Sequence, residues 1–471
     1  MLPQNSNAGS GGSKLPQYLA ALAATFLTFC GAAQTGWSSP ALLMLNNENS
    51  TLPIHLALNS SEASWVGSLL TIGGAVGAIP AGSIADCIGR KLTMLLLAVP
   101  IFVSWGLVYF AKSVQVLYGA RFLGGVAFGA ICAVVPMYVK EIAEDSVRGS
   151  LGTLFQIMMC CGITYTYAVG AVASYYSMAI CCAVLPVLFV IIFAFAPETP
   201  SFLLKRNRRT EAERSLQKLR GRGANVSKEL HVLESELNCD DSTAKISFWD
   251  AIGRRETKLA IVIALGTMAC QQLTGINIVI FYVSTIFTDA QLDWNAQLLA
   301  TFVGLAQLVA ALISIVLIDR TGRKILLQIS AVSMAICLAV LGFFFFFKDR
   351  GVDVSSYNIV PPCAVILYVL LFGIGFGPIP WLMSGEVLSD DVKGLCTSIA
   401  TSLNWGLAFV TTKFFQLIVH QIGNANTYWL LAVISVVAFC FVTFVIIETK
   451  GKSIQQVQLE LSGRKRVGNV I

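Results

Sequence analysis

Six amide side chains lie in strongly apolar stretches of the chain, where polar groups are uncommon. An amide offers two N–H donors and an acceptor oxygen, so a group of amides suits a ligand whose hydroxyl groups also donate and accept hydrogen bonds. The alternative, equally open for any single amide, is a hydrogen bond between two helices, worth about 0.6 kcal/mol. The six are Gln156, Gln271, Gln272, Asn277, Gln307 and Asn404.

A second group of polar residues is charged and occurs twice. The segment 141–149 reads EIAEDSVRG and the segment 386–394 reads EVLSDDVKG, while GRK occurs at 89–91 and again at 322–324. Carboxylates and guanidiniums form strong bidentate pairs, so we expect ion pairs between neighbouring helix ends. Simple anchoring of helix ends explains the basic residues but not the repeated Glu. The expected pairing residues are Arg90, Glu141, Arg148, Arg323 and Glu386.

Catalytic and metal-binding patterns are missing from the sequence. Its three histidines, His55, His231 and His420, have no HExxH spacing, and no GxSxG occurs. The glycine run GIGFG at 373–377 lacks the strand and the spacing of a nucleotide-binding loop. We therefore expect no enzyme activity, no metal and no cofactor.

The elements that must position these residues are membrane helices. The chain is 56% hydrophobic and 12% charged, whereas soluble domains carry about 25% charged residues. Apolar stretches long enough to cross a bilayer recur along the whole chain, and such stretches form helices. We predict twelve spans, near 17–38, 63–85, 92–111, 116–138, 150–173, 178–197, 258–287, 297–318, 325–347, 360–385, 395–418 and 427–447.

The positive-inside rule gives the orientation of the spans. Most of the 32 basic residues fall in segments that share one side, so we expect both termini to be cytoplasmic. This bias explains the net charge of +6 without a nucleic-acid partner. The exceptions, at or near the outer side, are Lys112, Arg121, Lys348, Arg350 and Lys413. Sequons at Asn49 and Asn59 in the first outer loop predict glycosylation there.

Two of the predicted spans contain residues that interrupt helices. Adjacent Gln271 and Gln272 cannot both face a cavity with Asn277 in a regular helix, and Gly275 allows the helix to bend or open. The stretch 373–380 holds three glycines and two prolines, which weaken a helix and remove N–H donors. We predict a discontinuous helix at mid-membrane in this second span.

Three charged motifs recur in the same order in the two halves of the chain, which indicates a duplication. They are the two pairs above, together with PETPS at 197–201 and IETKGKS at 447–453. We predict a cytoplasmic tail (1–16), a six-helix half (17–197), a cytoplasmic linker with short helices (198–257), a second six-helix half (258–447) and a final tail (448–471). Parallel repeats of this kind are known in major facilitator transporters.

The resemblance becomes specific in several motifs. RGSLGTLFQ at 148–156, QQLTGIN at 271–277, GFGPIPW at 375–381, the two GRK loops, PETP and ETKGK resemble the signatures of the sugar porter family. The chain also resembles facilitative hexose transporters and, through SSPALL at 38–43, facilitated trehalose transporters. The resemblance implies an all-α fold of twelve helices in two pseudo-symmetric halves. It also implies a cytoplasmic gate at the charged cluster.

The same resemblance implies a sugar site. Its residues are Gln156, Gln271, Gln272, Asn277, Gln307, Phe372, Trp381 and Asn404. Two positions depart from the hexose pattern: Gly373 stands where a Glu is usual and Gln307 where an Asn is usual. Gly373 is expected to enlarge the cavity, so trehalose and glucose both remain open as substrates.

The expected mechanism is uniport by alternating access. Proton-coupled members of the family carry an Asp in the first span, whereas this chain has Gln34 near that place. A proton symporter and a non-transporting sugar sensor are the alternatives. We expect a monomer in the plasma membrane, with a sugar and the lipid bilayer as its partners.

Overall fold

The computed structural model describes residues 13–45, 58–144, 146–221, 226–242, 254–292, 294–452 and 454–462. Helices make up nearly all of this part of the chain, and it contains no strand. The all-α fold predicted from composition is confirmed.

The first half of the chain forms six spans. α1 and α2 together make the first of them, separated only by a turn at Trp37. Prolines lie inside α3, α4, α5 and α7 without ending them. The helices are α1 (Leu15–Gly36), α2 (Ser38–Leu45), α3 (Ser60–Ile88), α4 (Arg90–Tyr109), α5 (Val114–Ile142), α6 (Arg148–Val172) and α7 (Tyr175–Phe193).

Three short helices follow: α8 (Pro200–Lys205), α9 (Arg209–Arg220) and α10 (Ser227–Ser242). α9 is amphipathic, with Ala212, Leu216 and Leu219 buried on one side and charged residues on the other. Ala212 and Leu216 join Phe202 of α8 in a small separate core, whereas Leu219 belongs to the main core. The expected short helices between the two halves are therefore present.

The second half also forms six spans, two of which are broken. Its helices are α12 (Arg255–Leu273), α13 (Ile276–Asp289), α14 (Ala296–Thr321), α15 (Arg323–Asp349), η1 (Ser355–Tyr357), α16 (Val360–Ile374), α17 (Ile379–Val387), α18 (Asp390–Val445) and α19 (Ile454–Leu461). α18 contains two spans, because Gly423 has non-helical backbone angles of 83° and 164°. Counting both, the eleven helical stretches that are long and apolar enough to cross a membrane give twelve spans.

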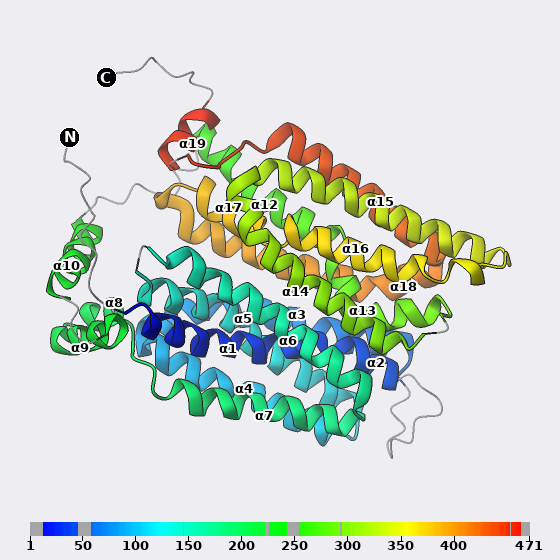
Figure 1. The fold of residues 1–471 in the computed structure, drawn as a ribbon, viewed down its shortest axis with the longest axis horizontal. Coiled ribbons are helices and arrows are strands. Elements are labelled where there is room, and N and C mark those ends of the chain that lie inside the picture. Colours follow the sequence, from blue (N-terminus) through cyan, green and yellow to red (C-terminus); the bar gives the residue numbers. More distant parts are fainter. Residues whose placement is uncertain are drawn as a thin grey trace.

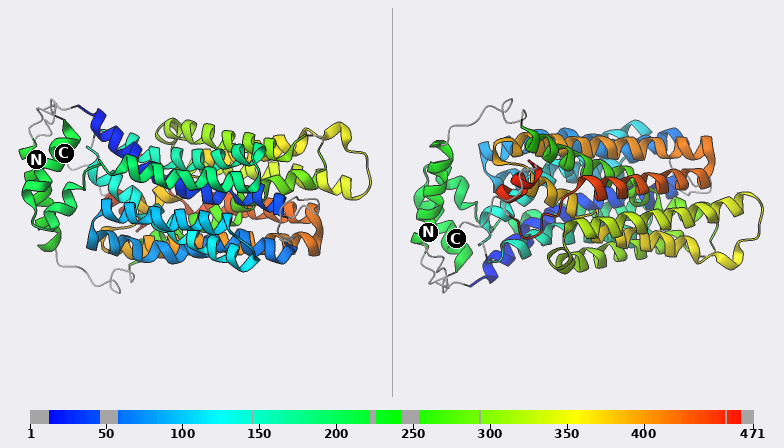
Figure 2. Two further views of the ribbon diagram at one scale, coloured as in Figure 1. Left: turned by 90° about the horizontal axis from the view of Figure 1, so that it is seen from below. Right: turned by 90° about the horizontal axis from the view of Figure 1, so that it is seen from above.

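The two halves lie side by side as two groups of roughly parallel helices (Figure 1). α8, α9, α10 and α19 gather at one end of the bundle, which we call the terminal face. α2 and η1 lie at the other end, the opposite face. Figure 2 shows the same separation from two further directions. The two-half arrangement predicted from the duplicated motifs is confirmed.

Close glycine contacts join α3 and α5 in the first half. A Cβ added at Gly73 or Gly77 of α3 would collide with backbone atoms of α5, and one at Gly125 or Gly129 of α5 would collide with backbone atoms of α3. Small residues allow membrane helices to approach in this way. The two backbones therefore touch directly.

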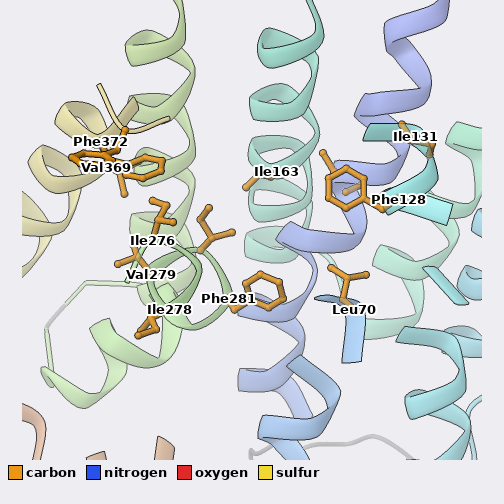
Figure 3. Close-up of a cluster of buried hydrophobic side chains, with 14 of the residues drawn as sticks. Leu70, Phe128, Ile131, Ile163, Ile276, Ile278, Val279, Phe281, Val369 and Phe372 are labelled. Carbon is orange, nitrogen blue, oxygen red and sulfur yellow. The ribbon is translucent and has the colours of Figure 1, made fainter. Parts of the chain in front are cut away.

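Apolar side chains fill the space between the halves at mid-bundle. Figure 3 shows Ile276, Val279 and Phe281 of the second half facing Ile163 of α6 and Phe128 of α5. All five side chains are buried. The halves therefore meet through an apolar surface, in which isolated polar groups need partners of their own.

Candidate functional site

The span that carries three of the predicted site amides is broken beside them. α12 ends at Leu273, and Gly275 takes a left-handed conformation with φ of +97° before α13 begins at Ile276. Glycine adopts this conformation without the steric cost that a Cβ brings. The predicted irregularity at Gly275 is confirmed.

The span containing the glycine and proline cluster is broken as well. α16 ends at Ile374 and α17 begins at Ile379, and across the four residues between them the regular pattern is lost, since the N–H groups of Gly375 and Gly377 both donate to the carbonyl of Phe372. Pro380 has no N–H, so the carbonyl of Phe376 loses the donor that a continuous helix would supply. The predicted discontinuity is confirmed.

Gln271 reaches from the first break to the second. Its Nε2 donates to the carbonyl oxygens of Phe376 at 2.7 Å and Gly377 at 2.9 Å. Its Oε1 accepts from Nδ2 of Asn404 at 2.7 Å. Carbonyl oxygens only accept, so this partner set fixes the orientation of the Gln271 amide.

The other amides of this region continue the chain of hydrogen bonds. Gln272 donates through Nε2 to Oδ1 of Asn404 at 2.9 Å, and Asn277 donates through Nδ2 to Oε1 of Gln272 at 2.6 Å. Gln271, Gln272 and Asn404 are all buried. We call Gln271, Gln272, Asn277 and Asn404 the amide network. Adjacent Gln271 and Gln272 both belong to it because Asn404, on α18, bonds to each.

Gln156 and Gln307 lie outside the amide network. Gln156, on α6, donates only a long bond of 3.6 Å to Sγ of Cys160. Gln307, on α14, is 7% exposed and has no hydrogen bond to any residue in the described ranges. Their helices touch where Gly304 packs on Thr164. Both amides retain unused donors and acceptors that a ligand can take.

Two predicted aromatic residues and one glycine flank the second break. Phe372 is buried, whereas Trp381, on α17, is 42% exposed. Gly373 differs from its expected role, because a Cβ there would lie 2.7 Å from Cβ of Ala310 on α14. The missing side chain lets α16 approach α14, so it serves packing and does not enlarge a cavity.

Arg121 is a buried charge at a position that the sequence placed near the outer side. Its guanidinium is fully buried and donates to the carbonyl oxygens of Val66 and Gln34 and to Oγ of Ser38. The ring of Trp37 lies 4.9 Å from its Cζ. Among the described residues no carboxylate pairs with it. The apolar sequence around Arg121 did not predict these hydrogen-bond partners.

The charged residues near the terminal face form pairs within each half. Arg90 pairs with Asp86 at 2.7 Å and with Glu141 at 3.0 Å. Arg323 pairs with Glu386 at 3.0 Å. The expected pairing between neighbouring helix ends is present, but each of these pairs joins helices of one half. The remaining predicted residue, Arg148, begins α6.

Two further carboxylates, which the sequence showed only as repeated motifs, complete this pattern. Glu198 accepts hydrogen bonds from the backbone N–H groups of Arg90 and Lys91, and Glu448 accepts from those of Arg323 and Lys324. Gly89 and Gly322 precede the arginines with φ of +100° and +97°, and a Cβ at either would collide with the carboxylate. The GRK motif is thus a helix N-terminus built to bind a carboxylate.

The environments of these two carboxylates differ. Burial raises the pKa of Glu198 above its ordinary value, despite backbone hydrogen bonds that act to lower it. Burial also acts to raise the pKa of Glu448, but four backbone N–H groups outweigh it and hold the pKa below the ordinary value. The second half therefore stabilises the ionised carboxylate more strongly.

Polar contacts between the halves lie toward the opposite face. Ser39 of α2 donates to Oγ of Ser284 on α13 at 2.7 Å. Tyr167 of α6 donates to the carbonyl of Ile280 at 2.5 Å. Lys413 of α18 donates to Oγ of Ser64 on α3 at 2.7 Å. These contacts hold the halves together at that end of the bundle.

Other predicted features have simpler outcomes. Asn59 is the N-cap of α3, where its Oδ1 accepts from the N–H of Glu62, and Asn49 lies outside the described residues. Within the described ranges no group of His, Cys, Asp and Glu could hold a metal ion.

The sequence is similar to those of known transport proteins. Residues 20–461 match the family described as "Sugar (and other) transporter". The chain is 37% identical to the facilitated trehalose transporter Tret1 of Bombyx mori over 96% of its own length and 88% of the relative. It is equally identical to Tret1 of Polypedilum vanderplanki, over 96% and 89% of the two chains.

Solved structures share the fold. The xylose transporter XylE from E. coli, in a partially occluded inward open conformation, aligns with a TM-score of 0.77 at 23% identity, covering 93% of this chain and 99% of XylE. An inward open conformation of XylE aligns with the same TM-score over 93% and 98% of the two chains.

Proposed function

Because the chain belongs to the sugar transporter family, we propose that it carries a sugar across a membrane by facilitated transport, with trehalose or a hexose such as glucose as substrate. The amide network at two helix breaks is the observation that carries this proposal. Sugar hydroxyls both donate and accept, so they can replace amide–amide hydrogen bonds one for one. The exchange leaves no buried polar group without a partner.

The remaining predicted site residues extend this site. Gln156 and Gln307 contribute unused amides from α6 and α14. Trp381 offers an exposed ring on which the apolar face of a pyranose can stack, and Phe372 closes the site beside it. Binding groups from both halves are what alternating access requires, since the sugar then lies between two bodies that move.

The conformation follows from where the halves touch. Polar contacts between them lie toward the opposite face, which supports an inward-facing state with the terminal face on the cytoplasmic side. The excess of Lys and Arg near the terminal face supports the same orientation. In this state the ion pairs of Arg90 and Arg323 each join helices within one half. A cytoplasmic gate closes when the two halves meet at the terminal face. Arg148, at the start of α6, belongs to that gate.

Several further features complete the proposal. Transport is uniport, because Arg121 faces Gln34 and no carboxylate in the first span. The protein works without a cofactor, a metal or an enzymatic step, as a monomer in the plasma membrane, and it binds no nucleic acid. Asn49 and Asn59 are its glycosylation sites on the outer side.

Counterflow in liposomes tests the function. Purified protein is reconstituted into vesicles loaded with unlabelled trehalose or glucose, and uptake of the same labelled sugar is followed. A transporter gives a transient accumulation of label above equilibrium, whereas a sensor that only binds sugar gives none. Vesicles loaded with mannitol serve as the control. Lack of accumulation across a panel of mono- and disaccharides excludes the proposed function.

A further inference from the structure

Side-chain hydrogen bonds from Gln271 and from Tyr368 join the two broken spans of the second half at their breaks, and we call these two contacts the stitches. Gln271, one turn before the first break, donates to two carbonyls in the second break, those of Phe376 and Gly377. Tyr368, in the helix before the second break, donates through its hydroxyl to the carbonyl of Thr274 in the first break, at 3.0 Å. Each broken span therefore supplies, from the helix before its own break, a hydrogen-bond donor to carbonyls in the break of the other span.

Both stitches donate hydrogen bonds to carbonyl oxygens that receive none from the backbone of their own helices. In the described part of the chain no backbone N–H donates to the carbonyl oxygen of Thr274, Phe376 or Gly377. A buried carbonyl without a donor costs about 1–3 kcal/mol. Tyr368 and Gln271 are themselves buried. The stitches are thus obligatory partners in an apolar environment.

The position of Thr274 gives its stitch a consequence for binding. Thr274 lies between Gln272 and Asn277, two members of the amide network, and beside the left-handed Gly275. The turn at Thr274 and Gly275 sets the angle between these two amides. The carbonyl of Thr274 accepts a hydrogen bond from the hydroxyl of Tyr368, which belongs to the other broken span and holds the turn in place. Loss of that hydroxyl lets the turn move and misaligns the amides.

We propose that Tyr368 is a positioning residue for sugar binding: its hydroxyl fixes the break between α12 and α13, so that the amide network keeps the geometry that a sugar requires. This inference rests on the proposed transport function. Tyr368 does not touch the sugar; it acts through the backbone of Thr274. Gln271 joins the same two breaks, because it donates to the carbonyls of Phe376 and Gly377 just before α17. Sugar that binds the Gln271 amide therefore changes the contacts at the start of α17.

The test compares Tyr368→Phe with Tyr175→Phe in the full chain. Tyr175 is a matched control, because it is also buried and donates to a backbone carbonyl, that of Val108, at 3.1 Å, but in the first half and at no helix break. Initial uptake of labelled trehalose and of labelled glucose is measured in liposomes over a range of concentrations. The apparent KM does not depend on how much protein is folded, whereas Vmax does.

The expected result is a three- to ten-fold rise in KM for Tyr368→Phe, with Vmax within two-fold of the unchanged chain and no change in KM for Tyr175→Phe. An unchanged KM in Tyr368→Phe overturns the proposal, whatever happens to Vmax. If the unchanged chain takes up neither sugar, the proposed function itself fails, and that result appears before any variant is examined.

A second measurement covers a variant that is folded but transports too slowly. Sugar bound to the folded state raises the melting temperature of the purified protein. Tyr368→Phe should need a three- to ten-fold higher sugar concentration for the same rise. In a Gln271→Ala background, Tyr368→Phe should change KM by less than two-fold, because the network is already disrupted. Independent, multiplying effects contradict the positioning role.

Discussion

The guanidinium of Arg121 faces the amide of Gln34, and no carboxylate in the part of the chain that the structure describes pairs with it. Its Nη1 donates to the Gln34 carbonyl at 2.6 Å and lies 3.5 Å from the side-chain Oε1. Among the described residues the partners of this cation are carbonyl and hydroxyl dipoles and the ring of Trp37. Neither Gln34 nor Arg121 can exchange a proton at physiological pH, so this pair offers nothing for a proton gradient to act upon.

Sugar uptake should therefore be independent of the proton gradient. Collapsing the gradient with an uncoupler should leave the initial influx of labelled sugar into cells or vesicles unchanged, within about 20%. A known proton-coupled sugar transporter in matched vesicles provides the positive control. A several-fold loss of influx that follows the pH gradient would contradict uniport.

Removing a site amide should weaken sugar binding from either half. Gln156→Ala should raise KM about five-fold, which corresponds to about 1 kcal/mol for one hydrogen bond to the sugar. Gln271→Ala should raise KM at least as much, because it also leaves the carbonyls of Phe376 and Gly377 without a donor. Gln328→Ala is the control, since Gln328 joins α15 to Thr443 of α18 and belongs to no predicted site. Saturation curves in liposomes give the comparison. If the control rises as much as the two site variants, loss of packing explains the effect.

Neutralising the two symmetric carboxylates should have unequal effects. The pKa of Glu448 is held below its ordinary value by backbone N–H groups against the effect of burial, so Glu448 stabilises the fold when ionised. Burial raises the pKa of Glu198, so its ionised form is less favoured. Glu448→Gln should lower the melting temperature at pH 7 more than Glu198→Gln does.

The sign of the pH dependence follows from the direction of the Glu448 shift. A depressed pKa gives stability that is present above the unfolded value of about 4.3 and is lost as the pH falls through the folded value. The melting temperatures of the unchanged chain and of Glu448→Gln should thus converge between about pH 5 and pH 3. If the difference between the two melting temperatures stays constant over this pH range, the effect of Glu448→Gln comes from altered packing and not from the lost charge.

Breaking the ion pairs of Arg90 with Glu141 and of Arg323 with Glu386 should also have unequal effects. Arg90 is 2% exposed and Arg323 is 14% exposed at the side chain. Glu141→Ala leaves the buried guanidinium of Arg90 with one carboxylate, that of Asp86, and the carbonyl of Ala85. It should cost about 3 kcal/mol, whereas Glu386→Ala should cost about 1 kcal/mol. Denaturation of the purified variants in one detergent measures both. Equal losses would show that burial does not determine the strength of these pairs.

Local chemistry explains what the sequence could predict. Gly275 and the cluster at 373–380 interrupt helices by their own backbone properties, so both breaks were predictable. The amides were recognised because polar side chains are rare in apolar spans. Their partners were not, since the contacts of Gln271 with Phe376 and Asn404 depend on how three distant segments pack.

The same limit applies to Gly373 and Arg121. The sequence suggested that Gly373 opens a cavity, but Ala310 of another helix lies where its side chain would be. Arg121 was expected at or near the outer side, and the sequence did not show that carbonyl and hydroxyl groups from α1, α2 and α3 surround it. Only the tertiary structure shows which neighbour occupies each position.

The glycine contact between α3 and α5 makes the halves mechanically unequal. Where two backbones touch, a bend or slide of either helix brings a steric clash, so we expect the first half to deform less than the second during transport. Both spans interrupted by non-helical gaps belong to the second half, which therefore takes up the deformation. Amide hydrogen exchange along α3 and α5 should accordingly be slow and insensitive to sugar, while exchange near Gly275 and Gly377 should respond to it.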